Sequence, residues 1–287
     1  MKLYKDYTDI DFKEKMVKLD TGIKMAYYEF GDENEKPLIL IHGITDGCVT
    51  WTQMIPELVK RGYHLYIPEY RGNGMTDKPE ADENGYTAEQ IAEDIINWMD
   101  KIELKNAHLA GHSYGSMISQ VLAAGSPEKF LTCTLIDTGV DCRSNLITYA
   151  EKGDGNFLGM NAYQEYLPEQ FCEEWMKTTN EDPAFREAVS MHLKQMPAYA
   201  FRNLIHGLEH FDGKYWLGMI EMPVSVIWGT EDDVFTAADQ ERVKQALNSS
   251  IKVNYIEVTG ASHNGFWDSC DRAVEYSDIL AGCIEDK

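Results

Sequence analysis

The chain of 287 residues has no long apolar run. No segment approaches the roughly 20 consecutive apolar residues that a membrane helix needs, and residues 1–7 (MKLYKDY) lack the apolar core of a secretory signal peptide. No internal repeat and no low-complexity linker are visible. With 44% hydrophobic residues the chain can bury one large core, so we expect a globular protein of the cytoplasm.

Positive charge is also scarce. The chain has 26 lysines and arginines against 48 aspartates and glutamates, and its formal net charge is -22. Nucleic acids and anionic membranes are polyanions, so this imbalance argues against both as partners. The six cysteines show no Cys-x-x-Cys spacing, and in a chain of this length they indicate reduced thiols rather than a disulfide framework.

Short β-rich runs alternate with amphipathic segments, a pattern typical of a mostly parallel sheet flanked by helices. We expect eight strands, the first two forming a hairpin, at residues 15–19, 23–30, 37–41, 63–67, 107–110, 131–136, 224–228 and 253–258. We expect helices at residues 51–60, 88–102, 116–124, 237–247 and 269–283. The pattern therefore predicts an α/β fold.

The alternation breaks between residues 141 and 219, where helical patterns at 162–178, 183–194 and 197–211 follow one another. An all-helical insertion after the sixth strand would lie over the carboxyl ends of the strands. We therefore expect a cap at 141–219 on a core formed by 1–140 and 220–287. Its aromatic and methionine side chains favour an apolar or aromatic acyl substrate, and the candidate contacts are Phe157, Met160, Trp175, Met196 and Trp216.

A Gly-x-Ser-x-Gly sequence, Gly111-His112-Ser113-Tyr114-Gly115, follows the fifth predicted strand and precedes a predicted helix. This context indicates a nucleophile elbow, a cramped strand-to-helix turn in which the flanking positions must be glycine. The hydroxyl of Ser113 then projects from the sheet at the positive end of the helix. The backbone N–H of Tyr114 points the same way and is a candidate oxyanion donor.

A serine nucleophile requires a histidine base and a carboxylate that orients the histidine. His263 follows the last predicted strand, and Asp232 follows the strand at 224–228, so both lie at the sheet edge where ligands bind in open α/β folds. Asp137, just beyond the sixth strand, and Asp233 are alternative acids, since spacing alone cannot distinguish the three geometries.

On these motifs the chain resembles a serine esterase or lactonase of the α/β-hydrolase fold superfamily with a helical cap, from about residue 17 to residue 284. The resemblance extends to the loop His42-Gly43-Ile44 after the third strand, which implies that the N–H of Ile44 is the second oxyanion donor. It also extends to the turn Arg71-Gly72-Asn73-Gly74, whose usual role is structural. The family pattern Gly-x-x-Asp implies Asp232 as the acid.

A rival motif, His206-Gly207-Leu208-Glu209-His210, has the His-x-x-Glu-His order of inverted zinc peptidases. A catalytic zinc needs a third protein ligand and a buried site, and Gly207 weakens the helix. We expect no metal there and two partly solvated histidines.

The sequence thus predicts hydrolysis of a carboxylic ester or lactone of a small substrate through an acyl-enzyme on Ser113, with no metal or organic cofactor. Hydrolysis of a carbon–carbon bond in a diketone is the nearest alternative reaction, because related capped enzymes use the same triad. A small-molecule receptor with the same fold and triad is a second alternative. An apolar face on the cap would suit a homodimer.

Overall fold

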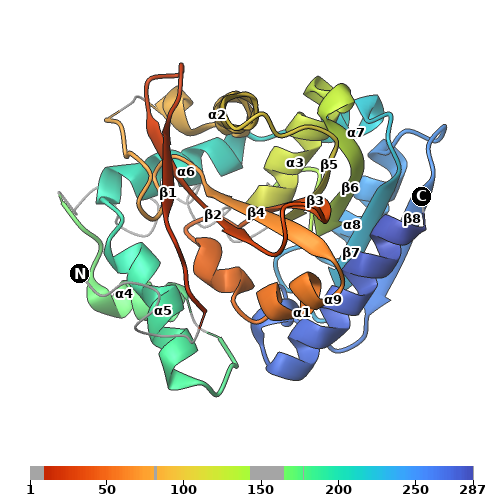
Figure 1. The fold of residues 1–287 in the computed structure, drawn as a ribbon. Coiled ribbons are helices and arrows are strands. Elements are labelled where there is room, and N and C mark those ends of the chain that lie inside the picture. Colours follow the sequence, from red (N-terminus) through yellow and green to blue (C-terminus); the bar gives the residue numbers. More distant parts are fainter. Residues whose placement is uncertain (1–9, 81–82, 143–164, 177, 287) are drawn as a thin grey trace.

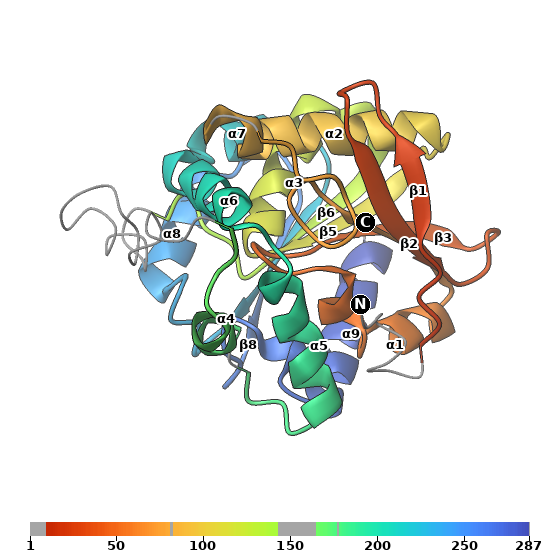
Figure 2. The same ribbon diagram turned by 90° about the vertical axis from the view of Figure 1, so that its left-hand side faces the viewer.

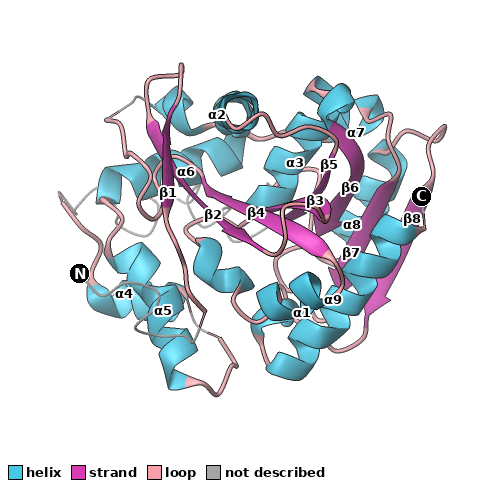
Figure 3. Cartoon of the chain, in the orientation of Figure 1, coloured by secondary structure: helices cyan, strands magenta, loops and turns pink. Residues whose placement is uncertain are grey.

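The computed structural model describes residues 10–80, 83–142, 165–176 and 178–286, and within them it contains the predicted eight-stranded sheet (Figure 3). The strands follow the order β1-β2-β4-β3-β5-β6-β7-β8 across the sheet. The pairs β1·β2 and β2·β4 are antiparallel, and all the other neighbours are parallel. The bounds are β1 (Lys15–Lys18), β2 (Lys24–Phe30), β3 (Lys36–Ile41), β4 (Tyr63–Glu69), β5 (Ala107–His112), β6 (Phe130–Ile136), β7 (Val224–Gly229) and β8 (Val253–Val258).

Helices cover both faces of the sheet (Figure 1). One face carries α2 (Ala88–Lys101), α3 (Tyr114–Gly125) and α7 (Lys214–Met219), and the other carries α1 (Ile55–Lys60) and α9 (Cys270–Glu285). Helix α8 (Ala237–Ala246) packs beside α7. Because helices bury both faces of the sheet, the sequences of the central strands are continuous apolar runs rather than alternating ones.

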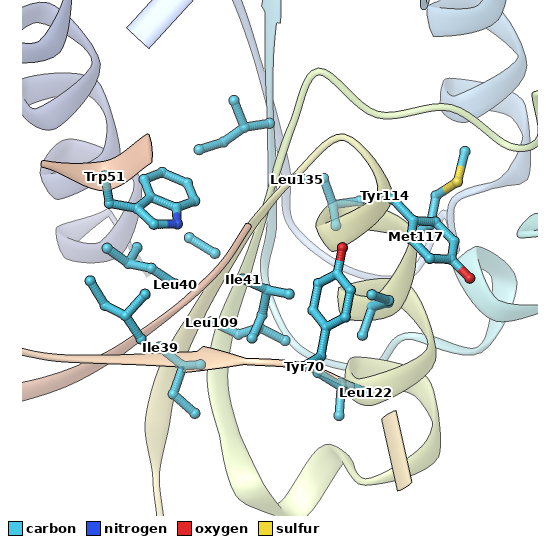
Figure 4. Packing of buried hydrophobic residues seen from close by; sticks show 14 of the residues in the cluster. Ile39, Leu40, Ile41, Trp51, Tyr70, Leu109, Tyr114, Met117, Leu122 and Leu135 are labelled. Atoms are coloured by element: carbon cyan, nitrogen blue, oxygen red, sulfur yellow. The ribbon is translucent and has the colours of Figure 1, made fainter. Parts of the chain in front are cut away.

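The core includes β3 and β5, where Ile39, Leu40, Ile41 and Leu109 have no exposed surface (Figure 4). Short 3-10 turns complete the connections: η2 (Cys48–Trp51), η3 (Glu83–Tyr86), η4 (Pro127–Lys129) and η7 (Gly265–Trp267). The packed strands give the loops at their carboxyl ends a rigid base.

Two predicted helices are shorter in the structure, and a proline accounts for each difference. The helix predicted at 51–60 begins only at Ile55, because Pro56 lies in its first turn and has no N–H with which to continue a helix from residue 51. The helix predicted at 162–178 is observed as α4 (Glu169–Trp175), with Pro168 as its N-cap. Residues 162–164 and 177 lie outside the described part of the chain.

The segment predicted as a cap contributes α4, α5 (Pro183–Lys194) and α6 (Ala198–His210). These helices gather at one side of the molecule, on the left in Figure 1 and toward the viewer in Figure 2. Helix α5 contacts η2, and α6 contacts η3. Among the described residues, no helix combines the length and the apolar character needed to cross a membrane.

A buried ion pair ties the turn after β4 to helix α2. Arg71 donates from Nε to Asp94 Oδ2 at 2.6 Å and from Nη2 to Asp94 Oδ1 at 2.8 Å, and a third bond, from Nη1, reaches the carbonyl of Gly85 at 2.7 Å. The two side chains are 7% and 0% exposed. Arg71 therefore has a structural contact.

Replacing one partner of this pair leaves the other charge buried and uncompensated. We expect Asp94→Ala to lower the free energy of unfolding by about 3–5 kcal/mol, measured by urea denaturation. Lys101→Ala on the same helix is the matched control, because the pair of Lys101 with Asp20 is exposed and exposed pairs contribute little. Equal losses for the two variants would contradict this account of the turn.

Candidate active site

Ser113 lies at the junction of β5 and α3, in a strained backbone conformation with φ 53° and ψ -123°. The close approach of neighbouring backbone requires the glycines on either side. A Cβ on Gly111 would lie 2.3 Å from the carbonyl oxygen of Gly115, and a Cβ on Gly115 would lie 2.3 Å from the carbonyl oxygen of His42. A strained residue held this way is characteristic of a functional site.

His263, on the loop after β8, connects Ser113 to Asp232, on the loop after β7. Its Nε2 lies 2.9 Å from Ser113 Oγ, and its Nδ1 lies 3.1 and 3.0 Å from the two carboxylate oxygens of Asp232. A carboxylate only accepts, so Nδ1 carries the proton and Nε2 is free to accept one from the serine hydroxyl. Asp232 is held in turn by the backbone N–H groups of Val234 and Phe235, at 2.8 and 2.9 Å.

Within the described residues, neither alternative acid is hydrogen-bonded to His263. Asp137 is fully buried, and its Oδ1 accepts a hydrogen bond from the backbone N–H of Gly229 at 2.8 Å. Burial, and then the nearby charge of Asp232, raise the pKa of Asp137 well above its ordinary value, which favours its protonated form. Asp233 is exposed. The imidazole of His263 is thus hydrogen-bonded to Asp232.

Two side chains from outside the loop, Tyr70 and Trp175, hold the loop that carries Ile44. Tyr70 donates to the carbonyl of Gly43 at 2.6 Å and stacks on His42 with ring centroids 4.2 Å apart. Thr45 is buried in a left-handed conformation with φ 61°. From helix α4, Trp175 donates from Nε1 to Thr45 Oγ1 at 2.9 Å. A residue of the predicted cap therefore contacts this loop directly.

A cavity of about 160 Å³ opens beside Ser113. Its wall is mainly apolar, with Trp175 and Met176 from the end of α4 and Ile205 and Leu208 from α6. The lining residues are Ile44, Asp46, His112, Ser113, Cys142, Trp175, Met176, Ile205, Leu208, Val234, Phe235, His263, Asn264 and Trp267.

The cap residues proposed from the sequence lie in different places. Trp175 lines the cavity. Met196 is buried outside the lining, and Trp216 packs against the core. Phe157 and Met160 lie outside the described residues. The sequence reasoning also missed several lining residues, among them Asp46, which lies only two positions after Ile44.

Burial keeps the other two histidines near Ser113 neutral. Loss of solvation lowers the pKa of His42 to about 4 and the pKa of His112 well below its ordinary value. His112 Nε2 lies 2.8 Å from the carbonyl oxygen of His263. Since a carbonyl accepts, His112 donates from Nε2 and helps to hold the loop of His263 in place.

Among the described residues, one group of side chains could offer three metal ligands. A ligand atom from each of Cys48, Glu69 and His192 lies within 4.8 Å of the others, and all three residues are buried. Glu69 accepts from the backbone N–H of Met75 at 2.9 Å, and the partly buried ammonium of Lys78 adds a positive charge to this region. None of the three residues lines the cavity beside Ser113.

In the rival motif, residues 206–210, the two histidine rings lie against each other. The rings of His206 and His210 stack with centroids 4.0 Å apart, and His210 Nδ1 lies 2.9 Å from the backbone carbonyl of His206. Gly207 lies against the backbone of Tyr86 and the hydroxyl of Tyr114, with no room for a Cβ. In the described part of the chain, the two histidines of the motif therefore stack on each other, and its glycine packs against η3 and α3.

The sequence of this chain is similar to the sequences of known hydrolases. A family model described as alpha/beta hydrolase fold matches residues 36–171. The 3-oxoadipate enol-lactonase 2 of Acinetobacter baylyi is 26% identical over 260 residues, which cover 88% of this chain and 90% of the enzyme. An epoxide hydrolase A of Mycobacterium tuberculosis is 30% identical over only 97 residues, 34% of this chain and 30% of its own length.

A solved structure shows the same fold. The esterase of Exiguobacterium antarcticum superposes with a TM-score of 0.79 at 15% sequence identity, over 95% of this chain and all of the esterase.

The roles of the two buried acids can be separated by mutation. We expect Asp232→Asn to lower kcat by about 10⁴-fold, because the amide removes the charge and disturbs the tautomer of His263. Asp137→Asn keeps the acceptor for Gly229 and should change kcat less than about threefold. Steady-state kinetics with an ester substrate checks both, and a larger loss in the Asp137 variant would assign the acid role to that residue.

The hydrogen bond from Trp175 to Thr45 can be tested separately. We expect Thr45→Val to lower kcat by roughly tenfold, the size of one lost hydrogen bond, because the loop of Ile44 loses a restraint. Thr45→Ser keeps the hydroxyl and is the matched control. Affinity for a boronic acid that mimics the tetrahedral intermediate should fall in parallel with kcat. If Val and Ser behave alike, the hydroxyl has no such role.

Proposed function

We propose that this chain, which belongs to the α/β-hydrolase fold superfamily, cleaves a carboxylic ester or lactone through an acyl-enzyme on Ser113. The observation that supports this proposal best is the continuous hydrogen-bonded path from Asp232 through His263 to the serine hydroxyl. A hydroxyl needs such a base to react at neutral pH.

The contacts of the two ring nitrogens of His263 determine the steps of the proposed reaction. As Ser113 Oγ attacks the ester carbonyl, Nε2 of His263 takes the hydroxyl proton, and Asp232 stabilises the imidazolium that forms. The bond to the leaving alkoxide then breaks, and Nε2 returns the proton to that oxygen. Water repeats the sequence on the acyl-enzyme, which releases the acid and restores the serine.

Two backbone donors would stabilise the oxyanion. Tyr114 is the first residue of α3, so its N–H has no acceptor within the helix, and the helix dipole favours negative charge at this end. Ile44 lines the cavity on the opposite loop. Removing a single donor of this kind costs on the order of 10²- to 10³-fold in rate.

The residue at the elbow favours acyl transfer over the opening of an epoxide. Attack by a serine on a saturated carbon would form an ether, which the triad cannot hydrolyse. A carboxylate nucleophile would form an ester there, and water could cleave it. The elbow of this chain carries a hydroxyl, so the partial similarity to an epoxide hydrolase does not extend to its reaction.

The cavity favours a small substrate with an apolar acyl or alcohol part. Its volume is about 160 Å³, and Trp175, Met176, Ile205 and Leu208 form much of its wall. Pockets of this kind derive affinity from apolar burial and orientation from a few polar groups.

The nucleophile assignment is tested with short p-nitrophenyl esters. Ser113→Ala, shown to be folded by circular dichroism, should lose at least about 10³-fold in kcat, whereas the exposed Ser249→Ala should match the wild type. Undiminished hydrolysis by the Ser113 variant would refute the assignment. A single-turnover burst followed by a stable adduct would favour the receptor alternative.

A further inference from the structure

Asp46 places a carboxyl group in the wall of the cavity beside Ser113. Its side chain is only 7% exposed, and it belongs to the same loop as Ile44. Among the described lining residues there is no lysine and no arginine, so no cationic side chain of that wall pairs with it. A polar group buried in an apolar wall is costly unless a partner satisfies it.

The imidazole of His112 lies beside Asp46 and presents an acceptor to it. Because His112 donates from Nε2 to the carbonyl of His263, its Nδ1 carries a lone pair. This Nδ1 lies 3.9 Å from Asp46 Oδ2 and has no hydrogen-bond partner among the described residues. An ionised Asp46 would place two acceptors face to face, so the geometry favours the protonated acid.

The other titratable groups around Asp46 agree with a neutral acid. Tyr70, from the turn after β4, is neutral because burial raises its pKa well above the ordinary value. His263, on the loop after β8, is already hydrogen-bonded to Asp232. Burial raises the pKa of Asp46 itself to about 8, and this effect outweighs a hydrogen bond from the backbone N–H of Gly43, which favours the ionised form. Below that pH the carboxyl offers an O–H donor to the cavity.

We propose that Asp46 donates a hydrogen bond to a second oxygen of the substrate, so that the preferred substrates are uncharged esters or lactones with an additional carbonyl oxygen. This inference rests on the proposed function of Ser113 and adds the substrate class. At 3.9 Å the carboxyl of Asp46 is too far from His112 Nδ1 for a hydrogen bond, so its O–H is available to a substrate that brings a matching acceptor into this mainly apolar wall. A plain alkyl substrate leaves it unpaired, and sites of this type discriminate strongly against the analogue that lacks the polar group.

The test compares substrates of nearly equal shape. In the acyl arm, p-nitrophenyl 4-oxopentanoate is compared with p-nitrophenyl 4-methylpentanoate. In the alcohol arm, 2-oxopropyl pentanoate is compared with 2-methylpropyl pentanoate. We expect the wild type to favour the oxo substrate by at least about tenfold in kcat/KM in one arm, which also shows on which side of the scissile bond Asp46 lies.

Two variants of Asp46 distinguish a hydrogen-bond donor to the substrate from a residue with a purely structural role. Asp46→Asn retains an N–H donor and should keep the preference, whereas Asp46→Leu should reduce the ratio to near one. In the wild type the ratio should fall as the pH rises through about 8, and in Asp46→Asn it should stay constant. The inference is overturned if neither arm shows a preference or if Asp46→Leu retains it. An ester of an amino alcohol that is favoured increasingly above pH 8 would instead indicate an ionised Asp46 that binds a cation.

A folding measurement serves if a variant is inactive. An acid whose pKa is raised on folding binds a proton between about pH 4 and pH 8, so it lowers stability progressively as the pH rises through that window. The Tm of Asp46→Asn relative to the wild type should therefore increase from pH 5 to pH 8. A constant difference would show that Asp46 is ionised and would overturn its role as a donor. Loss of ester hydrolysis in Ser113→Ala with no dependence of the ratio on Asp46 would leave the proposed function standing without this inference.

Discussion

The hydrogen-bonded path through His263 is the constraint on which the site depends, and the sheet makes it possible. Ser113 and His263 are 150 residues apart in the chain, and His263 and Asp232 are 31 apart. Strands β5, β7 and β8 run parallel, so the loops at their carboxyl ends meet at one edge. The glycines of the elbow then let the strained serine approach the neighbouring backbone without collision.

Burial assigns different roles to chemically similar side chains. Asp232 accepts from two backbone N–H groups and from the imidazole of His263, whereas Asp137 accepts only from Gly229 among the contacts described. Desolvation favours the protonated form of Asp137 and the neutral forms of His42 and His112. The low-dielectric interior thus leaves one histidine in a position to exchange a proton with the nucleophile and one carboxylate in a position to stabilise that histidine.

Much of the fold and the centre of the site can be predicted from the sequence, because they depend on local patterns. The strand periodicity, the elbow motif and the chain order of Ser113, Asp232 and His263 are all visible in the residues. Spacing alone did not distinguish Asp232 from Asp137, since both follow a strand and they differ in their hydrogen-bond partners; only the family pattern Gly-x-x-Asp favoured Asp232. The placement of Met196 and Trp216 away from the cavity also depends on how helices dock, which periodicity does not contain. Asp46 was missed because a single acidic residue in a loop resembles a solvated one.

The central claim is that Ser113 carries the acyl group during turnover, and mass spectrometry tests it most directly. The protein is mixed with a p-nitrophenyl ester, quenched in acid during turnover and digested. The account predicts a mass increase equal to the acyl group on the peptide that contains Ser113, and none in the Ser113→Ala protein. Continued turnover with no modified peptide, or with the acyl group on a different residue, would contradict it.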